Sequence, residues 1–365
     1  MSFSRRTFLE LTSTATVAMS MEKLFPTILL PKAKDKLGVA LVGLGYYSRD
    51  LLAPALQLTT HCHLTGIVTG TPSKIPTWQR QYQIPDKNVY NYETMDRIAD
   101  NPDIDVIYIV LPPSMHSEYC IRAANAGKHV WCEKPMAVTV AQCEAAIHAC
   151  ESNQVSLAIG YRMQHEVNTQ KVIAFGRNKT YGNVNHIEAS AGYFESRTDH
   201  WKQMKAMGGG AMYDMGVYPL NAARYCSGEE PIAVSARKST DRPSVYHEVD
   251  EHMHFELRFP SGATATCKTS LGQGMNELRV TCANGWYSMA PFQSYSGVRG
   301  TTSDGKTLSP SELNQQAKQM DDDALALING KPMLVPGEEG LRDIRVVEAI
   351  YRSAGMGGKW MDLKS

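Results

Sequence analysis

The stretch that decides the fold is VALVGLGYYS, residues 39–48. An apolar run of strand length ends at Gly43, and a helical pattern follows over residues 47–58. Gly43 allows a tight turn, and Gly45 lets a ligand approach the backbone closely. The N-terminus of the next helix offers N–H groups and a positive dipole end, which suit a pyrophosphate. Ser48 replaces the third glycine of the GxGxxG pattern. We expect a dinucleotide-binding turn, and a purely structural glycine turn is the alternative.

The alternation of strand and helix patterns continues from this turn to about residue 160. The run DVIYIVLP (105–112) is apolar throughout, as expected for a strand that is covered on both faces. We therefore predict a dinucleotide-binding Rossmann domain, with a doubly wound parallel sheet, over residues 37–160. The predicted strands are residues 37–43, 63–68, 105–112, 129–133 and 155–161.

After residue 160 the pattern changes to β-type runs joined by short turns, without long helical patterns between them. This predicts an open, mostly antiparallel sheet in a second domain, residues 161–365. The fold class is then α/β plus α+β. The acidic run Asp321–Asp323 is predicted to be a solvated helix face. The predicted strands are residues 184–192, 231–238, 250–259, 262–270 and 277–290, and the final helices are residues 311–330 and 338–354.

Composition bounds the class of partner. The 365 residues suit two domains, and Lys+Arg and Asp+Glu are both 37. Zero net charge argues against nucleic acid or an anionic membrane as a partner. After the N-terminus no apolar run is long enough to span a bilayer. The eight cysteines form no CxxC pair and no Cys/His cluster with zinc spacing, so we expect reduced, buried thiols and no metal site.

The N-terminus has a separate character. The run Ser4-Arg5-Arg6-Thr7-Phe8-Leu9 resembles a bacterial twin-arginine export signal, which we place at residues 1–21. A tail that happens to contain Arg-Arg is the alternative. Residues 22–36, with two prolines, are expected to form an extended arm. A functional signal predicts a periplasmic protein, and a non-functional one predicts a cytoplasmic protein.

The end of the second predicted strand bears on the choice of cofactor. An NAD site usually carries Asp or Glu there, for the ribose 2′-hydroxyl. Here the chain reads Val68-Thr69-Gly70-Thr71-Pro72-Ser73-Lys74, without an acid. A hydroxyl and a nearby cation suit a 2′-phosphate. We predict NADP rather than NAD, and the alternative for Lys74 is an ordinary surface lysine.

Two further segments carry groups suited to proton transfer. Lys134, in CysGluLysPro (132–135), follows the fourth predicted strand, and carboxyl ends of parallel strands line the ligand crevice. In GGGAMYDMGVYPLN (208–221), Asp214 and Tyr218 stand four residues apart and would share a helix face. The three glycines before them are expected to let backbone pass close to a ligand. A lysine cation stabilises a nearby phenolate, which can then act as base and acid. The alternatives are a Lys-Pro turn, an acid at a helix dipole and a core phenol.

Four motifs in order resemble one known family. GLG in the first turn, EKP after the fourth strand, IGYR after the fifth and GGGxxxDxGxY in the second domain are similar to the glucose–fructose oxidoreductase/inositol dehydrogenase (Gfo/Idh/MocA) superfamily. The similarity is greatest to its glucose–fructose oxidoreductase branch and extends from about Leu37 to the C-terminus. The resemblance implies a tightly bound NADP, sugar substrates, and homodimers or tetramers formed through the open sheet.

The resemblance also implies roles for single residues. Lys134 assists proton transfer, Tyr218 is the acid/base, and Asp214 orients the site. Lys202 stands where relatives usually have arginine, and residues 163–166 depart from the family pattern. Substrate would contact Lys134, Tyr161, Asp214 and Tyr218. Cofactor would contact Gly43, Leu44, Gly45, Tyr46, Tyr47, Thr69, Gly70, Lys74, Tyr92, Leu111, Pro112, His116, Glu133, Lys134, Arg162, Trp201, Lys202 and Tyr295.

Three functions remain open from the sequence. The first is an NADP-containing aldose oxidoreductase that oxidises the C1 hydroxyl of a sugar such as glucose to the lactone and passes the hydride to a second sugar such as fructose. The second is a conventional aldose 1-dehydrogenase with dissociable NADP. The third is a nucleotide-binding sensor without catalysis, which would have no need of a complete proton-transfer set.

Overall fold

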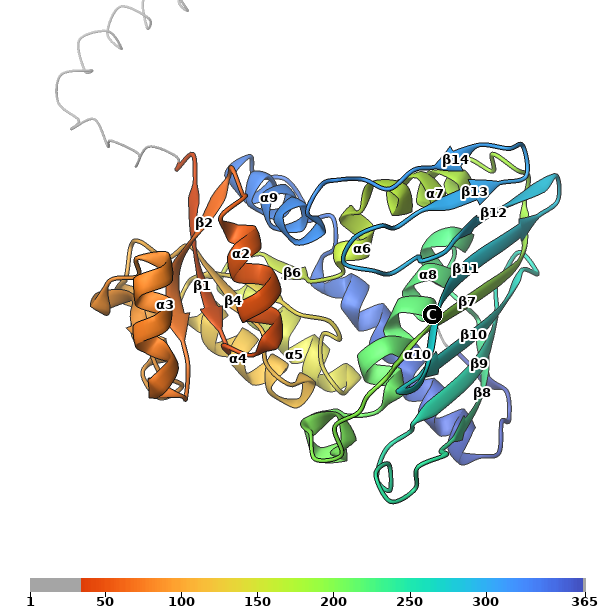
Figure 1. Ribbon diagram of the computed structural model, residues 1–365, viewed down its shortest axis with the longest axis horizontal. Coiled ribbons are helices and arrows are strands. Elements are labelled where there is room, and N and C mark those ends of the chain that lie inside the picture. The colour runs from red at the N-terminus through yellow and green to blue at the C-terminus, as the bar shows by residue number, and fades with distance from the viewer. Residues whose placement is uncertain (1–33, 364–365) are drawn as a thin grey trace, which may run out of the picture. The chain divides into compact units, whose positions relative to one another are not determined.

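The structure, a computed structural model, describes residues 34–363; the predicted signal and the arm up to residue 33 lie outside them. From Lys36 onward the chain forms one compact unit. Its first half contains a six-stranded sheet in the order β3-β2-β1-β4-β5-β6, and all its pairs are parallel (Figure 1). This is the strand order of a dinucleotide-binding Rossmann fold, as predicted. The strands are β1 (Leu37–Val42), β2 (Cys62–Val68), β3 (Val89–Tyr90), β4 (Val106–Ile109), β5 (His129–Cys132) and β6 (Leu157–Ile159).

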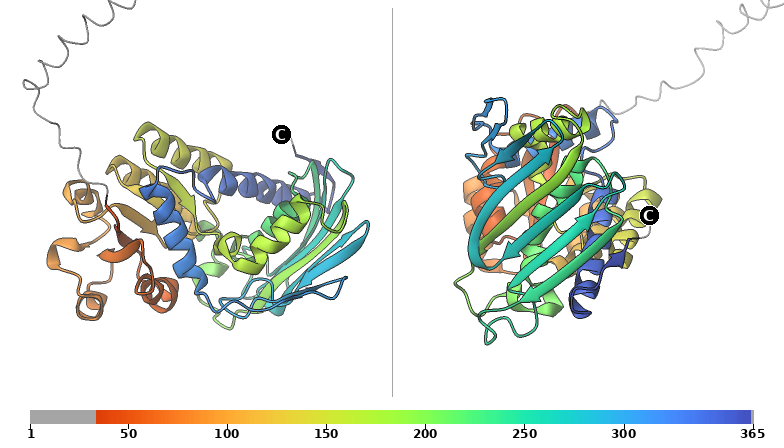
Figure 2. Two further views of the ribbon diagram at one scale, coloured as in Figure 1. Left: turned by 90° about the horizontal axis from the view of Figure 1, so that it is seen from above. Right: turned by 90° about the vertical axis from the view of Figure 1, so that its right-hand side faces the viewer.

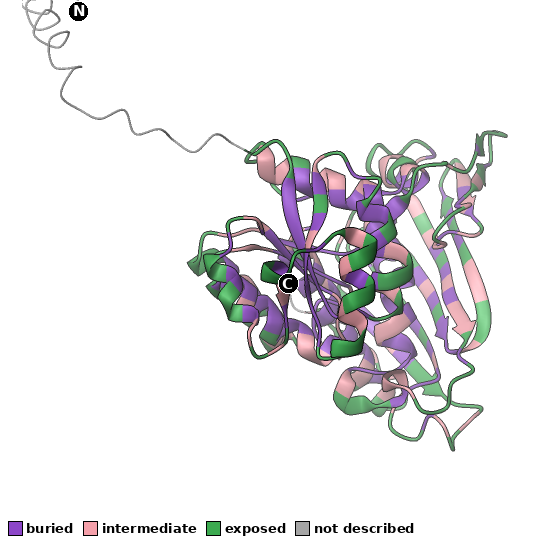
Figure 3. Ribbon diagram, turned by 60° about the vertical axis from the view of Figure 1, so that its left-hand side comes forward, coloured by how far each residue is buried: buried purple, intermediate pink, exposed green. Residues whose placement is uncertain are grey.

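The Rossmann strands are apolar because helices cover both faces of the sheet. Every residue of β1 and β4 is buried, and Figure 3 shows the strands of this sheet mostly buried, although β2 also carries the exposed His63. The predicted helix over residues 47–58 is a π-helical turn, η1 (Ser48–Leu52), followed by the short α2 (Ala53–Leu56). The remaining helices of this half are α3 (Ile75–Tyr82), α4 (Pro113–Asn125) and α5 (Val140–Ser152), with short 3₁₀ turns η2 (Pro72–Lys74), η3 (Asp86–Asn88) and η4 (Met95–Asp100).

The second half contains a nine-stranded sheet in the order β14-β13-β12-β11-β7-β10-β9-β8-β15. Only the β7–β10 pair is parallel among the described pairs of this sheet, so the expected mostly antiparallel sheet is confirmed. The predicted strand 277–290 is two strands with a turn between them. The strands are β7 (Val184–Phe194), β8 (Ala233–Ser239), β9 (His252–Arg258), β10 (Thr264–Ser270), β11 (Gly272–Cys282), β12 (Gly285–Met289), β13 (Gly300–Thr302), β14 (Thr307–Leu308) and β15 (Met361–Asp362).

Helices cover one face of this sheet and leave the other open (Figure 2). Strand β9 shows the alternation that follows: Met253, Phe255 and Leu257 are buried, whereas His254 and Glu256 on the opposite face are exposed. The buried face lies against helices that include α8 (Val217–Ser227) and α10 (Gly337–Gly355). Helix α9 (Gln315–Ile328) packs instead against α2 and β2 of the Rossmann half. The other elements of this half are α6 (Arg162–His165), α7 (Val167–Arg177), the short turns η5 (Trp201–Gln203) and η6 (Lys205–Met207), and the π-helical η7 (Met212–Gly216).

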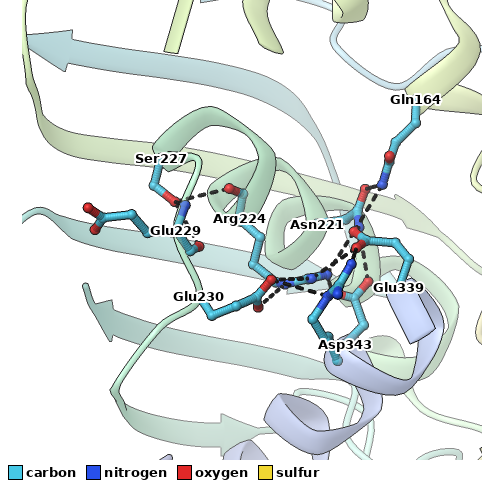
Figure 4. Close-up of polar contacts among 9 residues, drawn as sticks. Gln164, Asn221, Arg224, Ser227, Glu229, Glu230, Glu339 and Asp343 are labelled. Atoms are coloured by element: carbon cyan, nitrogen blue, oxygen red, sulfur yellow. Dashed lines mark hydrogen bonds and ion pairs between the residues drawn. The ribbon is translucent and has the colours of Figure 1, made fainter. Parts of the chain in front are cut away.

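A buried arginine fixes α8 against α10 (Figure 4). Arg224 Nη1 donates to Asp343 Oδ1 at 2.5 Å and to Glu339 Oε1 at 2.9 Å, and its Nε donates to Glu230 Oε2 at 2.7 Å. Asn221, one turn earlier on α8, donates to Asp343 Oδ2 at 3.2 Å. A buried guanidinium with all these partners is costly to move, because any shift leaves an unpaired charge in the interior. The position of α8, and of the residues at its start, is therefore fixed.

None of the helices within residues 34–363 is long and apolar enough to cross a membrane. All eight cysteines lie in the described part of the chain, and each is buried and free, as the sequence predicted.

The prediction for the acidic run Asp321–Asp323 is wrong, since these side chains have specific surroundings. Asp321 accepts hydrogen bonds from the backbone N–H groups of residues 60 and 61 at 2.9 and 2.7 Å. Asp322 pairs with Lys318 at 2.8 Å and with His165 Nδ1 at 2.9 Å. Asp323 is 1% exposed, and its Oδ1 lies 3.9 Å from His165 Nε2. The run joins α9 to α6 and to the start of β2.

Replacing Asp323 or its neighbour Asp322 by asparagine should change the stability of the protein in opposite directions. Burial raises the pKa of Asp323 to about 6, although His165 lowers it in part. The contribution of Asp323 to the free energy of unfolding is fully present below the unfolded pKa of about 3.9. It falls by roughly 3 kcal/mol as the pH rises from there through the folded pKa of about 6. Asp323→Asn removes this loss. We expect its melting temperature to exceed that of the wild type at pH 8, with little difference at pH 4.

Asp322→Asn is the matched control. Burial would raise the pKa of Asp322, but hydrogen bonds from His165 and Lys318 outweigh it and the pKa is lowered. This variant should be less stable than the wild type at pH 8. Thermal unfolding of both variants at the two pH values checks the pair, and a destabilised Asp323→Asn at pH 8 would contradict it.

Candidate active site

A cleft of about 1410 Å³ lies at the carboxyl ends of the Rossmann strands. Residues after β1, β4 and β5 line one side of it, and residues of β7, η5, η7 and α8 line the other. The strand order reverses between β1 and β4, which is the switch point where doubly wound sheets bind ligands. The position is therefore the expected one for a dinucleotide with a substrate beside it.

The glycine turn after β1 has the geometry of a phosphate-binding turn. Gly43 has φ +90°, and a Cβ on it would lie 2.3 Å from the carbonyl oxygen of Val110, so the position requires glycine. A Cβ on Gly45 would meet nothing within 4 Å, because that side of the turn faces the cleft. Ser48 is buried, and its hydroxyl donates to the Gly43 carbonyl at 2.5 Å, which closes the turn in place of the third glycine.

The end of β2 presents a hydroxyl and a cation to the same cleft. Thr69 and Lys74 both line it, and Lys74 Nζ donates to the carbonyl of Leu44 at 2.8 Å. No acidic side chain lines the cleft at this end among the described residues. Thr71 and Arg49 also line it, and the sequence did not single them out; Arg49 is largely exposed and pairs with Asp50 at 2.6 Å.

The three predicted catalytic residues meet at the other end of the cleft. Lys134 Nζ lies 4.6 Å from the centroid of the Tyr218 ring and donates to the backbone carbonyl of Asp214 at 2.7 Å. Asp214 lies in the π-helical turn η7. A π-turn would draw a donor for that carbonyl from the residue five positions on, and Pro219 has no N–H. The carbonyl of Asp214 is thereby available to Lys134.

The carboxylate of Asp214 points to a different lysine. Its Oδ2 accepts from Lys202 Nζ at 2.7 Å and from the Tyr193 hydroxyl at 2.9 Å, and Lys202 Nζ lies 2.6 Å from the Tyr193 oxygen. Burial alone would raise the pKa of Asp214, but the cations of Lys202 and Lys134 and the two hydrogen bonds outweigh it, so the pKa is lowered. Asp214 is therefore ionised near neutral pH.

Aromatic and charged groups enclose Tyr218. The guanidinium of Arg162 lies 4.7 Å from the Tyr295 ring centroid and 5.7 Å from that of Tyr218. Burial and the neighbouring Glu133 carboxyl raise the pKa of Tyr47, so this phenol stays protonated. Burial also raises the pKa of Glu133, which accepts from the Tyr108 hydroxyl at 2.6 Å. These contacts surround Tyr218 with two phenols that keep their protons, a guanidinium and the Lys134 cation.

Three predicted contact residues do not line the cleft. Gly70 lies behind the ring of Tyr92, where a Cβ would approach to 2.8 Å. His116 is buried, and its ring nitrogens lie 2.7 and 2.8 Å from the carbonyls of Leu111 and residue 135, so it joins the loops after β4 and β5. Tyr161 is buried beside Asp343, where burial and that carboxyl raise its pKa. The other predicted contacts all line the cleft: Gly43, Leu44, Gly45, Tyr46, Tyr47, Thr69, Lys74, Tyr92, Leu111, Pro112, Glu133, Lys134, Arg162, Trp201, Lys202, Asp214, Tyr218 and Tyr295.

The glycines 208–210 serve protein contacts rather than a ligand. Gly208 and Gly210 have positive φ, as expected, but none of the three lines the cleft. A Cβ on Gly208 would lie 2.9 Å from the side chain of Pro113, and one on Gly209 would lie 2.5 Å from the carbonyl of Lys202. The glycines thus let the segment that carries Lys202 pack tightly before η7 begins.

The sequence missed several cleft residues in the second half. Tyr193 is one position in an ordinary strand pattern, and only the fold brings it to Asp214. Arg197 donates to Glu195 Oε2 at 2.5 Å and stands beside His200, whose pKa burial and this arginine lower. No local motif marks these residues. The others that were missed in this half are Gly192, Tyr213, Met215, Asn276, Gln293, Ser294 and Ser296.

Gly45→Ala tests the turn without disturbing the fold. The added methyl has room in the protein but projects into the space that a pyrophosphate would occupy. We expect an unchanged melting temperature and at least a roughly tenfold weaker nucleotide affinity, or about 1.4 kcal/mol, by calorimetry. Gly274→Ala, where a Cβ also meets nothing, is the control and should change neither value. Unchanged affinity in Gly45→Ala would place the nucleotide elsewhere.

Comparison with known proteins follows the same division of the chain. Residues 37–161 match the family described as an oxidoreductase family with an NAD-binding Rossmann fold, and residues 169–288 match the GFO/IDH/MocA C-terminal domain. The chain is 42% identical to an aldose-aldose oxidoreductase of Caulobacter crescentus, solved with glycerol, with a TM-score of 0.86 over 90% of this chain and 100% of that one.

A second relative is a D-xylose 1-dehydrogenase [NADP(+)] of Haloarcula marismortui, 25% identical over 86% of this chain and 90% of its own. A levoglucosan dehydrogenase, solved with NADH and levoglucosan, shares the fold at 19% identity, with a TM-score of 0.79 over 90% of this chain and 100% of that one. Both family models and the 42% identical relative lead to one conclusion: the chain belongs to the GFO/IDH/MocA family of oxidoreductases with an NAD-binding Rossmann fold.

Proposed function

We propose that this protein is an NADP-containing aldose oxidoreductase. It oxidises the C1 hydroxyl of an aldose such as glucose to the lactone and passes the hydride to the carbonyl of a second sugar such as fructose. One observation carries the proposal: a phenol, Tyr218, lies under the cation of Lys134 in the cleft that the Gly43–Gly45 turn opens. The similarity to an aldose-aldose oxidoreductase supports the sugar-to-sugar form.

The residues divide the work of a hydride transfer between them. Tyr218 takes the proton of the C1 hydroxyl as hydride leaves C1, and returns it to the second carbonyl as that carbonyl is reduced. Lys134 stabilises the phenolate between these events. A nicotinamide cofactor, when bound, would supply the hydride acceptor and, when reduced, the hydride donor. Lys202 presents a hydrogen-bonding group to sugar hydroxyls along the opposite wall of the cleft.

The residues around the glycine turn fit NADP. Gly43 and Gly45 leave room for a pyrophosphate, and the β2 end offers Thr69 and Lys74 where an NAD site would carry an acid. Lys74, held by the Leu44 carbonyl, is the cation for a 2′-phosphate.

Replacing Lys74 tests this assignment. Lys74→Met removes a charge-assisted contact that only the 2′-phosphate makes. We expect the dissociation constant for NADP to rise by roughly tenfold, while that for NAD stays the same. Lys87→Met, which removes an exposed lysine paired with Asp103 at 2.6 Å, is the control for charge alone. An equal loss for both nucleotides would assign Lys74 to the shared part of the cofactor.

The second candidate is a conventional aldose 1-dehydrogenase with dissociable NADP. Similarity to a D-xylose 1-dehydrogenase [NADP(+)] favours it, and the same residues would perform its chemistry. The two functions differ in whether the nucleotide leaves after each turnover.

Purification without added nucleotide separates the two. The sugar-to-sugar enzyme should arrive with NADP, show the absorbance band of reduced nicotinamide when glucose is added, and lose it when fructose follows. A protein that arrives empty and reduces only added NADP⁺ would be the dehydrogenase. Tyr218→Phe should bind nucleotide normally but turn over roughly 10²- to 10⁴-fold more slowly. Full activity in this variant would exclude Tyr218 as the acid/base.

Two further proposals concern the protein's assembly and location. The open face of the nine-stranded sheet supports a homodimer or tetramer, since closed symmetric assemblies commonly cover such faces; sedimentation equilibrium measures the mass of the assembly.

The Arg5-Arg6 pair supports export to the periplasm, which fractionation of cells that express Arg5→Lys/Arg6→Lys would test.

A further inference from the structure

Two lysine–tyrosine pairs meet at Asp214, one on each side of it. Lys134 lies over the ring of Tyr218, 4.6 Å from its centroid. On the other side, Lys202 Nζ lies 2.6 Å from the Tyr193 oxygen and 5.1 Å from that ring's centroid. Asp214 serves both pairs, but with different atoms.

Lys134 binds the backbone carbonyl of Asp214, whereas Lys202 binds its carboxylate, and this difference decides the charge beside Tyr218. Lys134 donates to the backbone carbonyl, which is neutral, so the lysine keeps its full positive charge. The Asp214 carboxylate lies close enough to Lys134 for the lysine cation to help lower the pKa of Asp214. If it turned to Lys134, the resulting ion pair would cancel the field that favours phenolate at Tyr218.

We propose that Tyr193 is a positioning residue: together with Lys202 it holds the Asp214 carboxylate away from Lys134, so that Lys134 remains an unpaired cation beside Tyr218. The inference rests on the proposed function, which assigns Tyr218 as the acid/base. Tyr193 acts through Asp214 and transfers no proton itself.

The protonation states in this cluster are mutually consistent. Burial, and then the Asp214 carboxylate, raise the pKa of Tyr193, so its hydroxyl keeps its proton and donates it to Asp214 Oδ2 at 2.9 Å. The phenol oxygen in turn accepts from Lys202. A tyrosine fixed in this state is a poor base and a dependable donor, which is what holding a carboxylate requires.

Other groups face the two side chains but do not replace Tyr193. Arg197 and His200 stand near Asp214, yet Arg197 bonds to Glu195, and burial and Arg197 lower the pKa of His200. Among the described residues, the side-chain hydrogen bonds to the Asp214 carboxylate come from Lys202 and Tyr193. Around Tyr218 the charged and titratable neighbours are Lys134, Arg162, Glu133, Tyr47 and Tyr295.

Ultraviolet titration of the phenolate band tests the inference without any sugar. The difference between the wild type and Tyr218→Phe isolates the titration of Tyr218. The same difference is then measured between Tyr193→Phe and the Tyr193→Phe/Tyr218→Phe double variant. We expect the midpoint for Tyr218 to rise by about one pH unit in the Tyr193→Phe background, or tenfold less phenolate at a given pH below the midpoint. An unchanged midpoint would overturn the proposal.

Tyr181→Phe is the matched control. Tyr181 also donates to an aspartate, Asp304 at 3.0 Å, but lies outside the cleft, so its loss should leave the midpoint of Tyr218 unchanged. An equal shift in this variant would mean that a general loss of stability moves the titration, and would also overturn the proposal. If Tyr193→Phe does not fold, Lys202→Met removes the other donor to the carboxylate and should give the same upward shift, whereas Lys202→Arg should restore the wild-type midpoint.

Kinetics separate this inference from the proposed function. In an active enzyme, the acidic limb of the pH profile for sugar oxidation should move upward in Tyr193→Phe, by the same amount as the titration, with nucleotide affinity unchanged. If the wild type oxidises no sugar but the titration shifts, the proposed function fails and the positioning role stands. If the wild type is active but Tyr193→Phe shifts neither the acidic limb of the pH profile nor the titration midpoint of Tyr218, the positioning role fails and the proposed function stands.

Discussion

The hydrogen bond from Lys134 Nζ to the Asp214 carbonyl joins the two halves of the molecule where the chemistry is proposed. Lys134 follows β5 of the Rossmann sheet, and Asp214 precedes the helix that packs against the second sheet. A cation held by a neutral acceptor keeps its charge, and the same contact sets its place over the Tyr218 ring. The surrounding structure supports this one contact: Arg224 fixes α8 against α10, and the glycines 208–210 let the chain approach η7 closely.

Charge is distributed unevenly along the cleft, and the distribution suits two different ligands. In the part of the cleft that the second half lines, Lys202 pairs with Asp214 and Arg197 pairs with Glu195. These groups offer many hydrogen bonds with little net charge, as an uncharged polyhydroxylated substrate requires. At the β2 end, Lys74 bonds to a backbone carbonyl and keeps its charge for an anion. This distribution supports the proposal that a phosphate-bearing nucleotide and a neutral sugar bind at opposite ends of one cavity.

The features that the sequence predicted best are those that local geometry dictates. Gly43 has to be glycine because its φ is positive and a carbonyl blocks any Cβ. The glycine turn could therefore be recognised from the sequence alone. The two-residue β3 was missed, because so short a strand has no periodicity. Tyr193 and the surroundings of Asp321–Asp323 depend on contacts between residues distant in the chain. The family resemblance placed Tyr161 at the substrate, yet its side chain is buried beside Asp343, whereas Arg162 lines the cleft.

The π-helical turn η7 has a consequence for how this site can vary. A π-turn holds one more residue than the α-helical turn it replaces. The number of residues between Met212 and Gly216 therefore determines the geometry, in addition to their identity. Removing one residue there would rotate everything before it by about 100° relative to α8 and carry the Asp214 carboxylate off its partners, while the downstream core stayed intact. Point substitutions along this segment would not reveal that dependence. The number of residues in this segment therefore matters to the site as much as their identity does.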